Sequence, residues 1–222
     1  MNGCCCAQDE WRTGSGDCWW ECCWGIWEWG CWIYIWWIDI PFTNSLNQDF
    51  AGNSWSIKSI PTLSNGRYQN TDNQNQVAIG LENTQDGLLA VGTSDFELTV
   101  DVMPTVQKTQ VIIDSFRSLT LGGGLGWQLW LTTNGSIEFY VHSGIYIDTP
   151  PTNIYDGQQH SLKCVRTNGI VSIYIDNNLL TSTAINSDFT AQQSAIGHQY
   201  IDHGNGYYNF VGYIDNVKFK RR

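Results

Sequence analysis

Short runs in which apolar and polar residues alternate fill the second half of the chain, from about residue 91 to the end. In two neighbouring runs, 126–132 and 136–142, every second residue is apolar, and Thr133-Asn134-Gly135 lies between them. A repeat of two is typical of a strand with one buried face, and Asn-Gly is a turn signal. The pattern therefore predicts many short antiparallel strands joined by tight turns, with almost no helix.

The length of the loop at Asn134-Gly135 decides which side chains of this hairpin share a face. A two-residue loop would mix apolar side chains of one strand with polar side chains of the other. A three-residue loop, with Gly135 in the left-handed conformation, gives one wholly apolar face, and we therefore expect it. That face contains Trp127, Leu129, Leu131, Ile137, Phe139 and Val141. The opposite face contains Gln128, Trp130, Glu138, Tyr140 and His142.

The next hairpin turns at Thr167-Asn168-Gly169 and follows the same rule. Its inward positions are Leu162, Cys164, Val171, Ile173 and Ile175. Cys164 is thus expected to be a small core residue rather than a reactive thiol, because buried free cysteines are usually inert.

The last predicted strand covers 210–220, and in a regular strand Asp215 has the parity of Tyr213, Val217 and Phe219. We therefore expect the Asp215 carboxylate to point inward. Such a group needs backbone N–H donors or a cation. Asp215 is accordingly a candidate Ca²⁺ ligand.

The length of 222 residues suits one large β-sandwich, at 32–222, preceded by an arm at 1–31. The formal net charge of −10 argues against nucleic-acid binding, which needs clustered Lys and Arg. Acidic residues near the start argue against a secretory signal peptide. The apolar stretch 24–38 is interrupted by Glu28 and is shorter than the roughly 20 residues that span a bilayer, so we expect no membrane span.

The arm has an unusual composition. Seven of the eight cysteines lie in residues 1–31, and nine of the twelve tryptophans lie before residue 40. No CxxC pair occurs there, which weakens the case for structural zinc. Two explanations are open: the arm packs its rings against a neighbouring chain, or a Gly-rich linker gene has been read one base out of frame.

Four passages together resemble the concanavalin A-like lectin/glucanase superfamily, in particular the laminin-G-like jelly-roll domains of bacteriophage virion proteins and secreted bacterial proteins. They are Gly92–Pro104, the hairpin 126–141, Asp156-Gly-Gln-Gln-His160 through Val171-Ser-Ile-Tyr-Ile-Asp-Asn177, and Phe210-Val-Gly-Tyr-Ile-Asp-Asn-Val-Lys-Phe219. Less closely, 32–39 with Asp49-Phe-Ala-Gly-Asn53 is similar to the opening strand and loop of the family. The resemblance implies an all-β, two-sheet antiparallel jelly-roll sandwich.

The same fold includes glycanases and lyases, so catalysis has to be judged on residues. The Glu-x-Asp-x-x-Glu run of the glucanase branch is absent, and the nearest acidic grouping is Asp95, Glu97 and Asp101. The facing Arg, Gln, His and Tyr pattern of alginate lyases is absent too. We therefore expect no catalytic residues.

A binding module would stack aromatic rings on sugar faces and hydrogen-bond the hydroxyl groups, with Ca²⁺ as a cofactor in some relatives. Two groups of residues have these side chains. The candidate ligand-binding residues are Trp130 and Tyr140 on the hairpin, and Tyr200, Asp202, His203, Asn205, Tyr207 and Tyr208 in one loop.

The sequence therefore predicts a non-enzymatic surface or virion structural protein, located on a virion surface or outside the cell. It would display or bind glycans or other cell-surface ligands, as a phage tail-fibre or capsid decoration protein does in host attachment. The alternative is a glycan-active enzyme or a carbohydrate-binding module of a secreted bacterial protein.

Overall fold

A computed structural model of the chain describes residues 38–43, 45–46, 49, 51–58, 61–71, 80–83, 88–116, 126–141, 144–190, 193–198 and 208–222. These residues form fifteen strands and, within the described ranges, no helix. The predicted boundary between arm and sandwich, and the opening strand from residue 32 to 37, lie outside the described residues.

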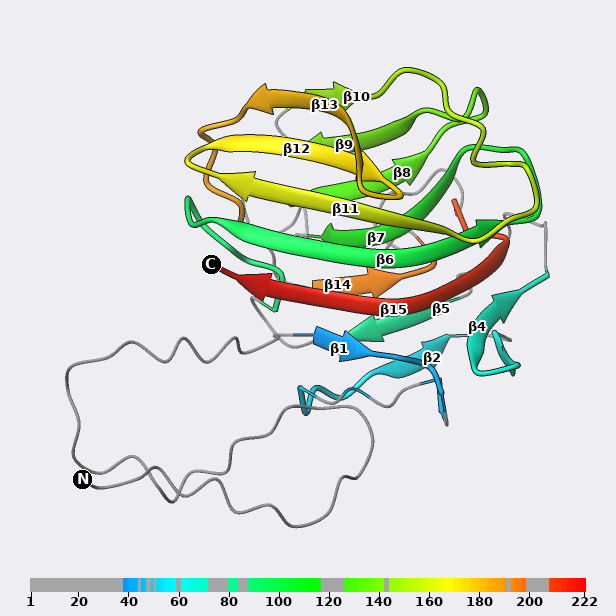
Figure 1. Cartoon of the computed structure of the whole chain (residues 1–222). Coiled ribbons are helices and arrows are strands. Elements are labelled where there is room, and N and C mark those ends of the chain that lie inside the picture. Colours follow the sequence, from blue (N-terminus) through cyan, green and yellow to red (C-terminus); the bar gives the residue numbers. More distant parts are fainter. Residues whose placement is uncertain are drawn as a thin grey trace, which may run out of the picture. The chain divides into compact units, whose positions relative to one another are not determined.

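The strands form two antiparallel sheets that pack face to face, as Figure 1 shows. Sheet A has the order β13-β12-β11-β6-β15-β4-β3, with β1 also paired to β15. Sheet B has the order β10-β9-β8-β7-β14-β5-β2. In sheet A the strands are β1 (Ile38–Ile40), β3 (Thr62–Ser64), β4 (Arg67–Asn70), β6 (Phe96–Pro104), β11 (His160–Thr167), β12 (Ile170–Ile175), β13 (Asn178–Ala184) and β15 (Gly212–Arg221). In sheet B they are β2 (Ser56–Lys58), β5 (Gly80–Asn83), β7 (Gln110–Phe116), β8 (Trp127–Leu131), β9 (Ile137–Val141), β10 (Ile145–Asp148) and β14 (Gln193–Ile196). The all-β jelly-roll sandwich expected from the sequence is confirmed.

The hairpin β8–β9 has the register that the apolar pattern predicts. Leu129 pairs with Phe139, and Leu131 pairs with Ile137. Thr132 N–H donates to the Ser136 carbonyl, which leaves three residues in the loop, and Gly135 has φ +85°. The predicted three-residue loop is therefore confirmed.

An aromatic cluster fills the centre of the space between the sheets. Phe96 on β6 of sheet A lies 5.9 Å from Trp127 and 6.3 Å from Phe139, both on sheet B, measured between ring centroids. Phe189 and Phe219 complete the cluster, at 6.2 Å and 5.9 Å from Phe96. Each of these rings is fully buried, so the cluster joins the two sheets through a large apolar area.

Asp49 connects β1 to the loop that follows it. Its carboxylate accepts hydrogen bonds from the backbone N–H groups of Asp39 and Ala51 and from the side chains of Asn53 and Trp55. Four donors at 2.7–3.0 Å hold a charged group that is only 9% exposed. Asp49 is the first residue of the segment Asp49-Phe-Ala-Gly-Asn53, whose sequence is similar to the opening loop of the laminin-G-like domains.

Cys164 is a core residue, as the sequence predicts. It pairs with Ile173 across β11 and β12 and is 1% exposed. Burial raises the pKa of the thiol far above its ordinary value, which keeps it protonated and unreactive. None of the described segments is a helix with the length and hydrophobicity needed to cross a membrane.

Candidate ligand-binding site

The strand register places two rows of side chains on the outer face of sheet B, the face turned away from sheet A. Because alternate residues of a strand point to opposite sides, this face holds the sequence neighbours of the inward Trp127, Leu129 and Phe139. One row runs Asp148, Glu138, Trp130 and Val111. The other runs Tyr146, Tyr140, Gln128, Asp114, Ala195 and Glu82.

Two aromatic pairs lie on this face. Tyr140 and Tyr146 stack with ring centroids 4.6 Å apart and an angle of 29° between the rings. The ring centroids of Trp130 and Tyr208 are 5.0 Å apart, and the rings are tilted by 56° to each other. Tyr146 is 56% exposed, while Trp130, Tyr140 and Tyr208 are half-buried. The pairs therefore offer ring surface to solvent in fixed orientations.

Gln128 lies between the two aromatic pairs. It is the cross-strand partner of Tyr140, and its Oε1 accepts a 2.9 Å hydrogen bond from the Trp130 indole Nε1–H. The side chain is fully buried, and its Nε2 has no hydrogen-bond partner among the described residues. A buried amide donor without an acceptor costs about 1–3 kcal/mol, so this group gains if a hydroxyl oxygen reaches it.

Two carboxyl groups lie beside Trp130. Glu138 on β9 is the partner of both Trp130 and Asp148, and Asp148 on β10 is exposed. Partial burial first, and then the charge and hydrogen bond of Asp148, raise the pKa of Glu138. The two carboxyl groups can accept hydrogen bonds from the hydroxyl groups of a ligand.

The rest of the outer face, over β7, β14 and β5, is covered. Asp114, Ala195 and Val111 are fully buried, and Glu82 is 2% exposed. His198, which follows β14, is also fully buried, with its Nε2 3.5 Å from the Glu82 carboxylate. The open part of sheet B is therefore the aromatic part over β8, β9 and β10, which we call the aromatic face (Trp130, Glu138, Tyr140, Tyr146, Asp148 and Tyr208).

The aromatic face brings together three residues that the sequence proposed separately. Trp130 and Tyr140 were expected on the hairpin, and Tyr208 at the end of a loop, where it now contacts Trp130. The remaining loop candidates, Tyr200, Asp202, His203, Asn205 and Tyr207, lie outside the described residues, as does His142.

Sequence reasoning missed Tyr146 and Asp148. Both are on β10, which is four residues long and pairs with β9. The alternation Ile145-Tyr146-Ile147-Asp148 was a signal for this strand, with Ile147 buried and Tyr146 and Asp148 exposed.

The expectation that Asp215 points inward is wrong. A β-bulge between Asp215 and Lys218, with Asn216 at φ +48°, adds one residue and reverses the parity of β15. Tyr213 and Asp215 therefore lie on the outer face of sheet A, whereas Val217 and Phe219 are buried in the core.

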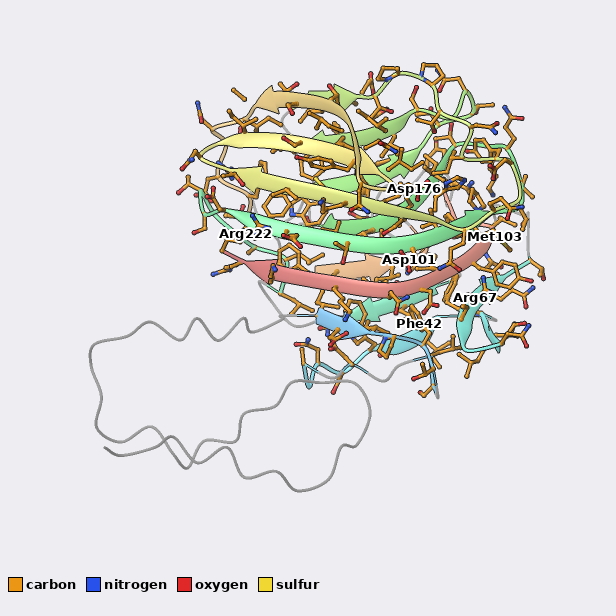
Figure 2. All side chains as sticks on the ribbon, in the orientation of Figure 1. Phe42, Arg67, Asp101, Met103, Asp176 and Arg222 are labelled. Atoms are coloured by element: carbon orange, nitrogen blue, oxygen red, sulfur yellow. The ribbon has the colours of Figure 1, made fainter. Side chains whose placement is uncertain are left out.

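On the outer face of sheet A, Asp215 is the cross-strand partner of Asp101. The Asn216 side chain donates to Asp101 at 2.8 Å, and Gln159 links Asp101 to Arg67. Figure 2 shows Arg67 and Asp101 on this side of the molecule. Burial, followed by the Asp101 charge, raises the pKa of Asp215 to about 6.

His160 lies nearby, between two carboxylates. Its Nδ1 is 2.7 Å from Asp176 and its Nε2 is 3.1 Å from Asp156. Burial alone would lower the pKa of His160, but the two carboxylates together raise it. Asp176, labelled in Figure 2, also accepts the Ser161 N–H. His160 and the Ser161 N–H thus tie the β12–β13 turn to β11 through Asp176.

The residues around Asp215 do not fit a Ca²⁺ ion well. Ca²⁺ takes six to eight oxygen ligands. Among the described residues, no group of three or more Asp, Glu, His or Cys side chains is close enough to hold one metal ion. Calcium binding at Asp215 therefore stays a prediction, and nothing below depends on it.

In sequence, no family model and no curated protein matches this chain. In structure, it is similar to the binding domain of botulinum neurotoxin DC, with 11% identity and a TM-score of 0.63, over 84% of this chain and 48% of that one. It is also similar to domain 4 of AbnA, an extracellular arabinanase from Geobacillus stearothermophilus, with 19% identity and a TM-score of 0.59, over 85% and 93%. A pentraxin from Limulus polyphemus matches at 15% identity and a TM-score of 0.50, over 67% and 72%. The chain spans about half the length of the neurotoxin binding domain. These similarities show the fold.

Proposed function

We propose that this chain is a non-enzymatic binding module that takes a saccharide on the aromatic face of sheet B. One observation supports this most strongly: two aromatic pairs lie on one face, with a buried amide and two carboxyl groups among them. Rings pack on the apolar faces of sugars, and amide and carboxyl groups bond the hydroxyls around the ring.

Two structural neighbours support a saccharide as the ligand. The AbnA domain was solved in complex with arabinotriose. A botulinum neurotoxin type C structure, similar to this chain at a TM-score of 0.60, is described as entering cells by interaction with two ganglioside molecules. At 19% and 12% identity these ligands cannot be transferred directly, and the proposal depends on the side chains of this chain.

The alternative, a glycan-active enzyme, would need a pair of carboxyl groups that flank a glycosidic bond. Retaining glycosidases hold the two groups about 5 Å apart, and inverting ones hold them further apart. Glu138 and Asp148 are cross-strand partners at the edge of sheet B, close enough for Asp148 to raise the pKa of Glu138. We propose that they bind hydroxyl groups of the ligand rather than flank a glycosidic bond.

We also propose that the module is part of a protein displayed on a virion surface or outside a cell, with residues 1–31 docking to other virion proteins or to a second copy. The resemblance to laminin-G-like virion domains supports this setting. The formal net charge of −10 fits a displayed surface that avoids nucleic acid.

The test is a glycan array and a thermal-shift screen with the whole chain and two matched variants. Tyr146→Ala removes an exposed ring from the aromatic face. Tyr174→Ala removes a half-buried tyrosine from the outer face of sheet A, where it packs under Lys163. We expect one glycan class to bind, and Tyr146→Ala to weaken that binding about tenfold, because one stacking contact contributes about 1–3 kcal/mol. Equal effects of the two variants, or no glycan bound, would refute the proposed function.

A further inference from the structure

The charged residues of the sandwich are divided unequally between its two sheets. The strands of sheet B contain four acidic residues, Glu82, Asp114, Glu138 and Asp148, and one basic residue, Lys58, at the end of edge strand β2. The strands of sheet A also contain four acidic residues, Asp39, Glu97, Asp101 and Asp215, but with them six basic ones: Arg67, Lys163, Arg166, Lys218, Lys220 and Arg221. Sheet B therefore differs from sheet A in its lack of basic residues.

On the aromatic face itself, the charges are those of Glu138 and Asp148. Neither β8, β9 nor β10 contains a Lys or Arg residue. Four further basic residues lie outside the strands: Lys108 and Arg222 are described, whereas Arg12 and Arg117 lie outside the described residues.

The amide of Gln128 is the second feature that defines the ligand. Its Nε2 is a neutral donor, fully buried, and without a partner among the described residues, and the Trp130 indole already occupies its Oε1. A ligand hydroxyl oxygen that reaches this donor would satisfy it. A ligand carboxylate could also accept from Nε2, but it would lie on the face of Glu138 and Asp148, where β8, β9 and β10 contain no Lys or Arg to offset its charge.

From these contacts we infer that the aromatic face selects uncharged saccharides and rejects acidic ones, such as sialylated or uronic acid-containing glycans. The inference rests on the proposed function and narrows its ligand class. Two like charges about 6 Å apart at a half-exposed site repel enough to weaken binding about tenfold. The rejection comes from this carboxyl pair, since the aromatic rings would stack on either class of sugar.

The experiment measures binding of the whole chain to matched ligand pairs that differ in charge: lactose with α2,6-sialyllactose, and galactotriose with trigalacturonic acid, alongside arabinotriose. Two double variants separate the faces. Glu138→Gln with Asp148→Asn removes the carboxyl pair of sheet B. Asp101→Asn with Asp215→Asn removes the carboxylate pair of sheet A and is the matched control.

In each matched pair that gives binding, we expect the neutral saccharide to bind at least tenfold more tightly than the acidic one. The sheet B variant should reduce this ratio to about twofold, and the sheet A variant should leave it unchanged. Raising NaCl from about 50 to 500 mM should also narrow the ratio, because salt screens exposed charges. If the sheet B double variant does not fold, Asp148→Asn alone, at an exposed position, replaces it.

Acidic glycans that bind as tightly as the neutral ones, or more tightly, would overturn this inference and leave the proposed function standing. A preference for neutral glycans that the sheet A variant abolishes would also overturn it. Failure of both classes to bind would instead refute the proposed function itself.

Discussion

Replacing Asp49 with alanine removes one acceptor group that four donors share. Two of these donors, the Asp39 backbone N–H and the Trp55 indole N–H, are buried, at 3.0 and 2.9 Å from the carboxylate. The other two, from Ala51 and Asn53, are part-buried and can turn to water. The substitution therefore leaves two buried donors without an acceptor.

Each buried unsatisfied donor costs about 1–3 kcal/mol, so Asp49→Ala should lower the free energy of unfolding by about 4 kcal/mol. For a domain of this size, that corresponds to a fall in Tm of about 8–16 °C. Asp49→Asn keeps one acceptor oxygen but turns an amide N–H₂ toward the remaining donors. It should cost about half as much, roughly 2 kcal/mol.

The assay is urea unfolding followed by tryptophan fluorescence, with thermal melts alongside. Asp148→Asn is the matched control, because it removes an exposed carboxylate and should change stability by less than about 0.5 kcal/mol. If Asp49→Ala stays within about 1 kcal/mol of the wild type, or is no worse than Asp49→Asn, the carboxylate does not hold β1 to the sandwich.

Three further predictions follow from other positions. Burial and the Asp101 charge raise the folded-state pKa of Asp215 to about 6. The contribution of Asp215 to stability is therefore greatest below its unfolded-state pKa of about 4 and is lost as the pH rises through 6. Asp215→Asn should then raise the free energy of unfolding by about 1 kcal/mol at pH 7.5, allowing for solvent screening, and by almost nothing at pH 4. Thermal melts in which the gain is larger at pH 4 would contradict a raised pKa for Asp215. Gly135→Ala should lower the free energy of unfolding, measured in urea titrations, by about 2 kcal/mol or more, because the new Cβ would lie 2.5 Å from the Thr152 carbonyl oxygen. Gly144→Ala, at φ +84° with nothing within 4 Å, should lower it by about 1 kcal/mol. Equal losses would contradict the clash at Gly135. Cys164 should resist alkylation in the folded chain and react after denaturation, as peptide mapping by mass spectrometry would show, and labelling under native conditions would contradict its burial.

The strands of the second half were predictable because each has one clear apolar face. In the hairpin β8–β9, a single choice of loop length fixed which residues are buried, and Gly135 supplied the conformation that this loop requires. Cys164 was predictable for the same reason, since its parity follows from its apolar neighbours Leu162 and Val171.

Asp215 was mispredicted because a bulge depends on pairing, not on local pattern. Asn216 tolerates a positive φ, and its side chain bonds Asp101, which lies 115 positions earlier in the sequence. The alternation rule assumes that no residue is inserted, so the residues before Asn216, Tyr213 and Asp215, were assigned to the wrong face.

The candidate site was predictable only in part. Alternation placed Trp130 and Tyr140 outward, but it could not show that Tyr208 contacts Trp130, since that contact joins residues 78 positions apart. Nor could it show that Gln128 is fully buried although it faces away from the core. Burial on an outer face depends on what other segments cover, and a strand pattern contains no such information.

The most direct test of the aromatic face as the ligand site is the indole N–H spectrum of the whole chain during titration with a neutral saccharide selected on the array. Trp130 is the probe, because its indole N–H donates to Gln128 on the aromatic face. Trp127 is the control, because its indole N–H donates to the Leu89 carbonyl in the core. Trp130→Phe and Trp127→Phe assign the two signals. The proposed site predicts that the Trp130 signal shifts with saturation while the Trp127 signal stays in place. Saturable binding that leaves the Trp130 signal unchanged would place the ligand elsewhere on the protein.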